Sequence, residues 1–136
     1  MNNIHASCIA IKRKGVLFIG ASGAGKSDMA LRLIEFCGAK LVADDRVDIS
    51  VVKGQIKASC PNGIKGLLEV RGVGIVSYPY VLKTTVKMIV ELTNKPLERL
   101  PVAKFYNLNG IQLPLIRLNP FESSSCAKVL SALRLL

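Results

Sequence analysis

One stretch constrains the fold and chemistry of this chain more than any other, the octapeptide Gly20-Ala21-Ser22-Gly23-Ala24-Gly25-Lys26-Ser27. A glycine, four residues and then Gly-Lys-Ser is the pattern of a phosphate-binding loop. Its glycines let successive backbone N–H groups point at a polyphosphate, and the helix that follows directs the positive end of its dipole at the same oxygens. The pattern therefore predicts that residues 20–27 hold a nucleotide, that Lys26 reaches its β- and γ-phosphates, and that Ser27 binds Mg²⁺.

The sequence on both sides of the loop supports this interpretation. Residues 16–19 are an apolar run that predicts a buried strand leading into the loop. Residues 28–36 predict a helix leading out of it, with Met29, Leu33 and Phe36 on one buried stripe. A strand, this loop and a helix in that order form the unit in which phosphate loops occur. The alternative is a glycine- and serine-rich turn before an ordinary helix, which these flanks disfavour.

The bulk composition limits the classes of protein that this chain can represent. With 136 residues, half of them apolar and 21% charged, we expect residues 1–136 to form a single domain. No apolar run approaches the ~18 residues of a membrane-spanning helix, and the N-terminus lacks the layout of a signal peptide, so we expect a cytoplasmic protein. The cysteines are scattered without metal-binding or redox spacing and are expected to be small buried apolar residues: Cys8, Cys37, Cys60 and Cys126.

The formal net charge of +10 indicates anionic partners without naming one. Basic residues are dispersed along the chain, apart from Lys12-Arg13-Lys14 at an expected hairpin turn. Three Tyr, four Phe and no Trp leave little material for stacking on bases. Nucleic acid is therefore not an expected partner, whereas an anionic nucleotide and an acidic protein fit the charge.

Two adjacent carboxylates, Asp44 and Asp45, follow a short apolar strand predicted for residues 39–43. Carboxylates at a strand end beside a nucleotide commonly face Mg²⁺ and the attacking group. We therefore interpret them as part of the same site as the loop, and the alternative is a polar turn. His5, the only histidine, precedes the first predicted hairpin and on its own fits an ordinary surface residue.

A third segment of interest is Leu68-Glu69-Val70-Arg71-Gly72-Val73-Gly74-Ile75, which places an acid and a base two residues apart in an apolar run. If the segment is extended, Glu69 and Arg71 lie on the same face. Two interpretations stay open. One is a surface ion pair on a strand before a flexible turn, and the other is a metal-binding carboxylate with a phosphate-binding arginine.

The remaining patterns predict more strands than helices. We expect a hairpin of strands at 7–12 and 15–19 with its turn at 13–15, a second hairpin at 47–52 and 55–59, strands at 85–92 and 110–118, and a final helix at 126–136. In the strand at 85–92, one face is expected to carry Val86, Met88, Val90 and Leu92. The predicted fold class is α/β, with a strand-rich mixed sheet and few helices.

Together these segments resemble the catalytic domain of HPr kinase/phosphorylase, the bacterial enzyme that phosphorylates a serine of the phosphocarrier protein HPr. The matching blocks occur in the family's order: His5, the loop at 20–27, the Leu-Val-Ala-Asp-Asp-Arg-Val run at 41–47, and the Glu-x-Arg-Gly-x-Gly segment at 69–74. The resemblance implies a phosphate-loop fold of the phosphoenolpyruvate carboxykinase-like type, with ATP and Mg²⁺ as cofactors. It also implies a homo-oligomer, a trimer or hexamer, and a short form that lacks the family's N-terminal domain.

Position by position, the resemblance gives the motif residues roles. Lys26 would contact the γ-phosphate, Ser27 and Glu69 would bind Mg²⁺, and Asp44 would be the general base that accepts the proton of the target serine. The other catalytic and signature positions are His5, Asp45, Arg99, Arg71, Gly72 and Gly74.

The resemblance thus predicts an ATP-dependent protein serine kinase that acts on HPr or an HPr-like carrier. In the family, phosphorolysis of the product is linked to a basic Lys-Thr-Gly-Arg-Asn segment, whereas this chain has Arg-Leu-Asn-Pro-Phe-Glu at 117–122, so phosphorylase activity is left open. Two other functions keep the loop: a non-catalytic module that senses ATP, and a small-molecule kinase. The second would be expected to carry an inserted helical lid, and the sequence has no such segment.

Overall fold

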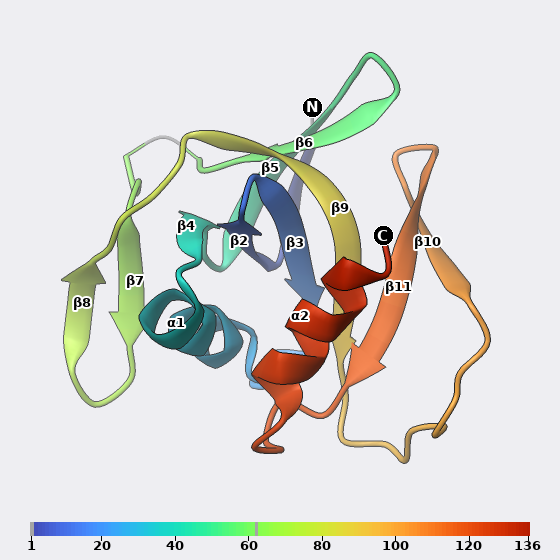
Figure 1. Cartoon of the computed structure of the whole chain (residues 1–136). Coiled ribbons are helices and arrows are strands. Elements are labelled where there is room, and N and C mark those ends of the chain that lie inside the picture. The colour runs from blue at the N-terminus through green and yellow to red at the C-terminus, as the bar shows by residue number, and fades with distance from the viewer. Residues whose placement is uncertain (1, 62) are drawn as a thin grey trace.

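The computed structural model describes residues 2–61 and 63–136, which form eleven strands and two helices (Figure 1). The strands are β1 (Asn2–His5), β2 (Ser7–Ile11), β3 (Lys14–Ile19), β4 (Lys40–Ala43), β5 (Arg46–Val52), β6 (Gln55–Ser59), β7 (Leu67–Val70), β8 (Gly74–Ser77), β9 (Lys83–Leu92), β10 (Lys104–Leu108) and β11 (Ile111–Leu118). The helices are α1 (Lys26–Cys37) and α2 (Ser125–Arg134). The strand-rich α/β class that the sequence predicts is confirmed.

Nine of the described strands form one mixed sheet. Its order is β1-β5-β6-β9-β3-β2-β4, and β9 also pairs with β11, which in turn pairs with β10. The ten-residue strand β9 pairs with β6 through residues 83–85 and with β11 through residues 89–92. It runs parallel to β3 and β11 and antiparallel to β6. β9 therefore joins the two halves of the sheet, and Figure 1 shows it curving across the molecule.

The strand that leads into the phosphate loop, β3, is buried on both faces. Val16, Leu17 and Phe18 have no exposed surface. Because side chains alternate across a strand, Val16 and Phe18 join the core beneath the helices, and Leu17 joins a second core on the opposite face. Burying one such side chain contributes about 1.5–3 kcal/mol. The predicted buried strand is confirmed, and its burial fixes the position at which the loop begins.

The hairpin of β2 and β3 turns earlier than the sequence predicts. Lys12 and Arg13 both have positive φ, 49° and 66°, which is the type I′ geometry that suits the twist of a two-residue hairpin. The predicted turn at 13–15 was wrong by one residue, because Lys14 already pairs with Ile11. This register places Ser7 opposite Phe18, at the end of β3 that leads into the phosphate loop.

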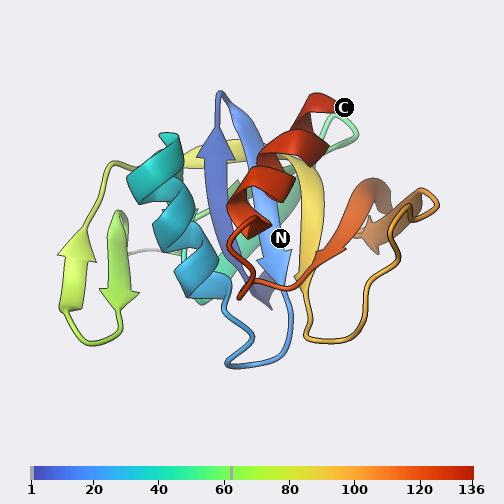
Figure 2. The same ribbon diagram turned by 60° about the horizontal axis from the view of Figure 1, so that its bottom comes forward.

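Both helices cover the same face of the sheet (Figures 1 and 2). The buried stripe of α1 runs through Met29, Ala30, Leu33 and Ile34. Phe36 is 82% exposed, so its predicted place on this stripe was wrong. With 3.6 residues per turn, Phe36 lies roughly a quarter-turn from the centre of the observed stripe.

The strand β9 departs from the predicted alternation at one position. Met88, Val90 and Leu92 face the core beneath the helices, as predicted, but Val86 lies in the core on the other face. The pairing register with β3 shifts between Gly15 and Val16, whose partners are Val86 and Met88. This bulge adds one residue to β9 and moves Val86 to the opposite face.

The strands β7 and β8 form a separate two-stranded sheet beside α1 (Figure 1). Leu68 is buried in the helix-side core, whereas Val73 and Ile75 are 75% and 66% exposed. The Tyr78 hydroxyl donates a 2.8 Å hydrogen bond to the Glu35 carboxylate on α1. This hydrogen bond raises the pKa of Tyr78. The hairpin is thus attached to the rest of the fold by the buried Leu68, by Val70 and Tyr78 packed against the same core, and by the surface hydrogen bond to Glu35.

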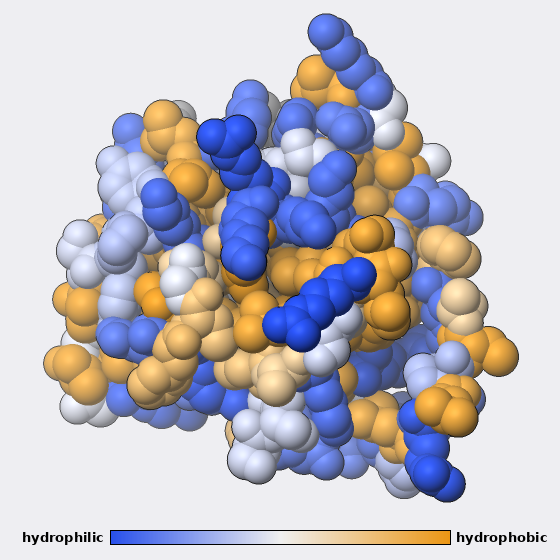
Figure 3. All heavy atoms as spheres, in the orientation of Figure 1, coloured by the Kyte–Doolittle hydropathy of each residue, from blue (hydrophilic) through white to orange (hydrophobic). Residues whose placement is uncertain are grey.

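The surface mixes hydrophilic and hydrophobic side chains over the face that carries the helices (Figure 3). No helix among the described residues is long and apolar enough to cross a membrane. Cys8 is buried and the other three cysteines are half-buried, all as free thiols. Burial raises the pKa values of Cys8, Cys60 and Cys126, so these thiols stay protonated at neutral pH, as expected for apolar packing residues.

Candidate active site

The loop between β3 and α1 has a backbone that only glycine accommodates at several positions. Gly20, Gly23 and Gly25 have φ values of 149°, 81° and 104°. A Cβ atom on Gly20 would lie 2.9 Å from the Leu92 carbonyl oxygen. A Cβ atom on Gly25 would lie 3.1 Å from the Pro120 ring. The positive φ values favour glycine at all three positions, and the close neighbours add a steric reason at Gly20 and Gly25.

The helix α1 begins at Lys26, directly after the loop. Its N-cap residue, Gly25, offers no side-chain hydrogen bond to the first turn. The first N–H groups of α1 thus have no capping side chain, and the positive end of the helix dipole points toward the loop. This arrangement is suited to an anion.

The Lys26 side chain is buried within the loop. It is 7% exposed, and its Nζ donates hydrogen bonds to the carbonyl oxygens of Gly20, at 2.9 Å, and Ala21, at 3.1 Å. A buried ammonium group is costly unless it has acceptors or an anionic partner. Two neutral carbonyls satisfy two of its three donors without neutralising its charge, so Lys26 is placed to attract negative charge to the loop.

Asp44, at the end of β4, is held beside the loop by two hydroxyl groups. Ser27 at the start of α1 and Ser7 in β2 each donate a 2.7 Å hydrogen bond to Asp44 Oδ1. Throughout residues 2–61 and 63–136, no donor contacts Oδ2. The carboxylate is therefore oriented through one oxygen, and the other is available to accept a proton.

Asp45 lies in a strained turn between β4 and β5. Its φ is 67°, and the Arg46 N–H donates a 2.7 Å hydrogen bond to the Asp44 carbonyl, which closes a three-residue γ-turn. His5 Nε2 lies 3.0 Å from Asp45 Oδ1, and both side chains are partly exposed. His5 is placed there because β1 pairs with β5 in the register His5 to Arg46. Strained backbone of this kind often occurs at functional sites.

The structure therefore connects several residues that the sequence singles out, and it adds one that the sequence analysis missed. His5 lies against Asp45, and Ser27 donates a hydrogen bond to Asp44, the residue next to Asp45 in the sequence. Ser7 was missed. It stands fully buried in an otherwise apolar strand, and this polar exception at the strand end is the one signal that could have revealed it.

The Glu-x-Arg-Gly-x-Gly segment has a different setting. Glu69 lies in β7 and is exposed, and Arg71 lies in the turn that follows rather than on the same strand. The Val73 N–H donates to the Val70 carbonyl at 2.9 Å, and Gly72 has a φ of 84°, as a type II turn requires. Across the described residues, neither Glu69 nor Arg71 forms an ion pair or side-chain hydrogen bond. The segment is extended only as far as Val70, so the condition under which Glu69 and Arg71 would share one face is not met.

Arg99 and Gly74 also lie apart from the loop. Arg99 is exposed in the segment between β9 and β10, and Gly74, with a φ of 131°, begins β8. No group of three or more His, Cys, Asp and Glu side chains in the described part of the chain is arranged to hold a metal ion. The loop, Asp44, Asp45 and His5 thus form the connected part of the candidate site.

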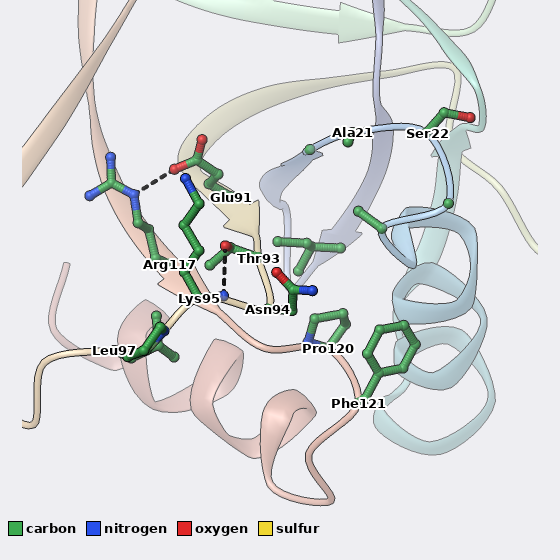
Figure 4. Close-up of a pocket in the computed structure, with 15 residues that line it drawn as sticks. Ala21, Ser22, Glu91, Thr93, Asn94, Lys95, Leu97, Arg117, Pro120 and Phe121 are labelled. Atoms are coloured by element: carbon green, nitrogen blue, oxygen red, sulfur yellow. Dashed lines mark hydrogen bonds and ion pairs between the residues drawn. The ribbon is translucent and has the colours of Figure 1, made fainter.

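A cavity of about 760 Å³ opens beside the loop, and Asp44 is not among the residues that line it (Figure 4). One wall is the first half of the loop, residues 20–24, and the others are residues 91–97, Arg117 and the Pro120-Phe121 pair. At one side of the cavity, Arg117 Nε lies 2.5 Å from Glu91 Oε1. A volume of this size is typical of small-molecule sites.

The fold and the site define an α/β protein in which a glycine-rich loop with the phosphate-loop sequence pattern lies beside strand-end carboxylates. Comparison with known proteins agrees with this class. A sequence profile described as the HPr Serine kinase C-terminal domain matches residues 1–133. The chain belongs to the HPr serine kinase C-terminal domain family.

The structure of the Hpr(Ser) kinase/phosphatase from Coxiella burnetii is similar to this chain, with a TM-score of 0.86 and 27% identity over 98% of this chain and 95% of that one. HPr kinase/phosphorylase of Cupriavidus necator is 30% identical over 95% of this chain and 43% of its own length. The Clostridium tetani protein of the same name is 45% identical over 56% of this chain and 25% of its own length. The chain thus spans less than half the length of these two curated relatives.

Proposed function

We propose that this chain is an ATP- and Mg²⁺-dependent protein kinase that phosphorylates a serine of HPr or of an HPr-like carrier. The observation that carries the proposal is the position of Asp44. Its Oδ1 accepts hydrogen bonds from Ser7 and Ser27, and Ser27 is the last residue of the phosphate loop. A base oriented in this way, next to a phosphate site, suits transfer to a hydroxyl group.

The chemistry follows from these positions. The serine hydroxyl of the carrier approaches the γ-phosphorus of ATP and gives its proton to Asp44 Oδ2. The new bond forms between the serine oxygen and the γ-phosphorus, and the bond to the bridging oxygen breaks, so that ADP leaves with that electron pair. Lys26 neutralises charge on the transferred group, because its Nζ exchanges the Gly20 and Ala21 carbonyls for phosphate oxygens.

The donor set near the loop fits Mg²⁺. Hydroxyl and carboxylate oxygens are the ligands that this ion prefers in proteins, and the Ser27 hydroxyl and the Asp44 carboxylate are already 2.7 Å apart. We assign Ser27 to the metal, together with Glu69 from the β7–β8 hairpin. When bound, Mg²⁺ would offset charge on the β- and γ-phosphates. His5 would support the site indirectly, because its contact with Asp45 holds Asp45 and the γ-turn in place.

The choice of HPr rests on the names of the relatives and on charge. The relatives in Cupriavidus necator and Clostridium tetani are named HPr kinase/phosphorylase. The net charge of +10 favours encounter with an acidic carrier protein. A cytoplasmic location, a trimeric or hexameric assembly and the placement of Arg99 near phosphate belong to the same proposal.

The test is phosphotransfer followed by site mapping. The purified chain is incubated with labelled ATP, Mg²⁺ and the HPr-like proteins of its host, and the labelled residue is identified by mass spectrometry. Label on a carrier serine is the expected result. ATP binding without transfer to any carrier would contradict the proposal and select a nucleotide-sensing module, and label on a small molecule would select a kinase of another substrate class. Adding inorganic phosphate to the phosphorylated carrier tests the phosphorylase reaction.

A further inference from the structure

The cavity beside the loop is separate from the residues that would perform phosphotransfer. It is lined by the first half of the loop, residues 20–24, whereas Lys26, Ser27 and Asp44 lie outside its walls. A nucleotide that lies along the loop has its reacting phosphate at one end and its nucleoside at the other. Because Asp44 and Ser27 mark the reacting end, the cavity lies where the chain of phosphates would lead away from it.

The walls of the cavity suit a base and a ribose better than a further anion. Arg117 and Glu91 offset each other's charge. Leu97, Pro120 and Phe121 provide apolar surface, and the Asn94 side-chain amide offers both a donor and an acceptor (Figure 4). Phe121 is 71% exposed although it lines the cavity, so one face of its ring is free to stack.

The segment that carries Phe121 is fixed to the loop and to α1. Arg32 of α1 donates hydrogen bonds to the Pro120 carbonyl, at 2.6 Å, and to the Ser125 hydroxyl, at 2.8 Å. The Ser125 hydroxyl also donates to the Pro120 carbonyl at 3.2 Å. Pro120 is buried against Gly25, where a Cβ atom would meet its ring. An exposed aromatic ring on a segment held this firmly is preorganised for a ligand.

We propose that this cavity binds the base and ribose of the nucleotide, with Phe121 stacking on the base and Arg32 as the positioning residue for its wall. The inference rests on the proposed ATP-dependent function, since the phosphates must lie along residues 20–27. The cavity adds a determinant of ligand specificity that the loop motif does not contain. The loop recognises phosphates of any kind, and the cavity makes the site prefer a nucleoside triphosphate to the bare phosphate chain.

The test compares ATP with inorganic tripolyphosphate, both with Mg²⁺, by titration calorimetry. Tripolyphosphate offers the same chain of phosphates without a nucleoside. The wild-type chain is expected to bind ATP more tightly. Phe121→Ala is expected to weaken ATP binding by about tenfold, the order of one lost base–aromatic stack, and to leave tripolyphosphate binding nearly unchanged. The matched control is Phe36→Ala, which removes an exposed ring outside the cavity and is expected to change neither.

The possible failures are distinguishable. If the wild-type chain binds neither ligand, the proposed function fails, and the nucleoside site fails with it. If it binds both with equal affinity, or if Phe121→Ala weakens both equally, the nucleoside site alone is wrong. For Arg32, the readout is the ratio of the two dissociation constants. Arg32→Lys keeps the charge but not the forked hydrogen bonds, and a positioning role predicts that it lowers the preference for ATP. An unchanged ratio would contradict that role.

Discussion

The phosphate loop and the β7–β8 hairpin both carry motif residues, but they are built into the fold in different ways. The loop begins at the end of a strand buried on both faces, and the backbone and the Lys26 side chain hold it in place. Glu69 lies on a separate two-stranded sheet and Arg71 in its turn, and Leu68, Val70 and Tyr78 attach this hairpin to the rest of the fold. The loop side is therefore held by contacts within the chain, whereas the Glu69 and Arg71 side chains have no ion-pair or hydrogen-bond partner among the described residues.

If the loop is the organised half of the site, replacing Lys26 should have the largest effect of the loop and hairpin variants. Lys26→Ala is expected to lower kcat/KM for phosphotransfer by about 10³-fold, because a buried cation aimed at the transferring group is lost. Steady-state kinetics with the carrier measures this. Lys14→Ala, at the far end of the same strand, is the matched control and should retain activity. Equal activities of the two variants would contradict the assignment of the loop.

Replacement of Glu69 should have a smaller effect than replacement of Lys26, and this effect should appear in the dependence of activity on Mg²⁺. Glu69→Gln removes one charged ligand from the open side of the site, and we expect the Mg²⁺ concentration for half-maximal activity to rise at least about tenfold. A magnesium titration of the rate measures this shift. Glu98→Gln, an exposed glutamate outside the cavity, serves as control. An unchanged magnesium dependence in Glu69→Gln would leave the hairpin without its assigned metal role.

The smallest of these effects is expected from a substitution that weakens the contact between the β7–β8 hairpin and α1. Tyr78→Phe removes the hydrogen bond to Glu35 at the surface and should shift Tm by less than about 2 °C. Hydrogen exchange should show faster exchange of the β7–β8 amides and unchanged protection of β3. If β3 lost protection as well, the hairpin would be an integral part of the core, and the contrast between the two regions would be wrong.

The sequence predicted β3 and the phosphate loop better than it predicted the β7–β8 hairpin, for physical reasons. The apolar run of β3 and the glycine pattern of the loop are local signals, and each led to the correct element. The strands β1, β8 and β10 were missed. β1 is a polar edge strand that pairs with the distant strand β5, so long-range pairing decides its conformation rather than local pattern. β10 instead forms a hairpin with β11 around Asn109 and Gly110, whose φ values are 51° and 86°, and this local turn signal was overlooked.

Among the residues of the candidate site, too, some could be predicted from local sequence and others could not. Adjacent motif residues such as Lys26 and Ser27 could be found from spacing alone. Arg32 could not, because its partner Pro120 is 88 residues away along the chain. Ser7 offered only its polar side chain in an apolar strand as a signal, and its partner Asp44 is 37 residues away. Phe121 lines the cavity on a segment that Arg32 helps to hold against the loop. Contacts of this kind depend on the register of the sheet and on helix packing, which the sequence does not display.

The most direct test of the account is a single-turnover measurement on Asp44→Asn, with ATP binding measured in parallel. The substitution keeps the shape of the side chain and the hydrogen bonds from Ser7 and Ser27, and it removes the ability to accept a proton from the carrier serine. We predict that ATP affinity stays within about threefold of wild type, while the rate of transfer falls by about 10²- to 10⁴-fold, the usual contribution of a general base. Transfer at the wild-type rate would contradict the assignment of Asp44 and, with it, the mechanism proposed for this site.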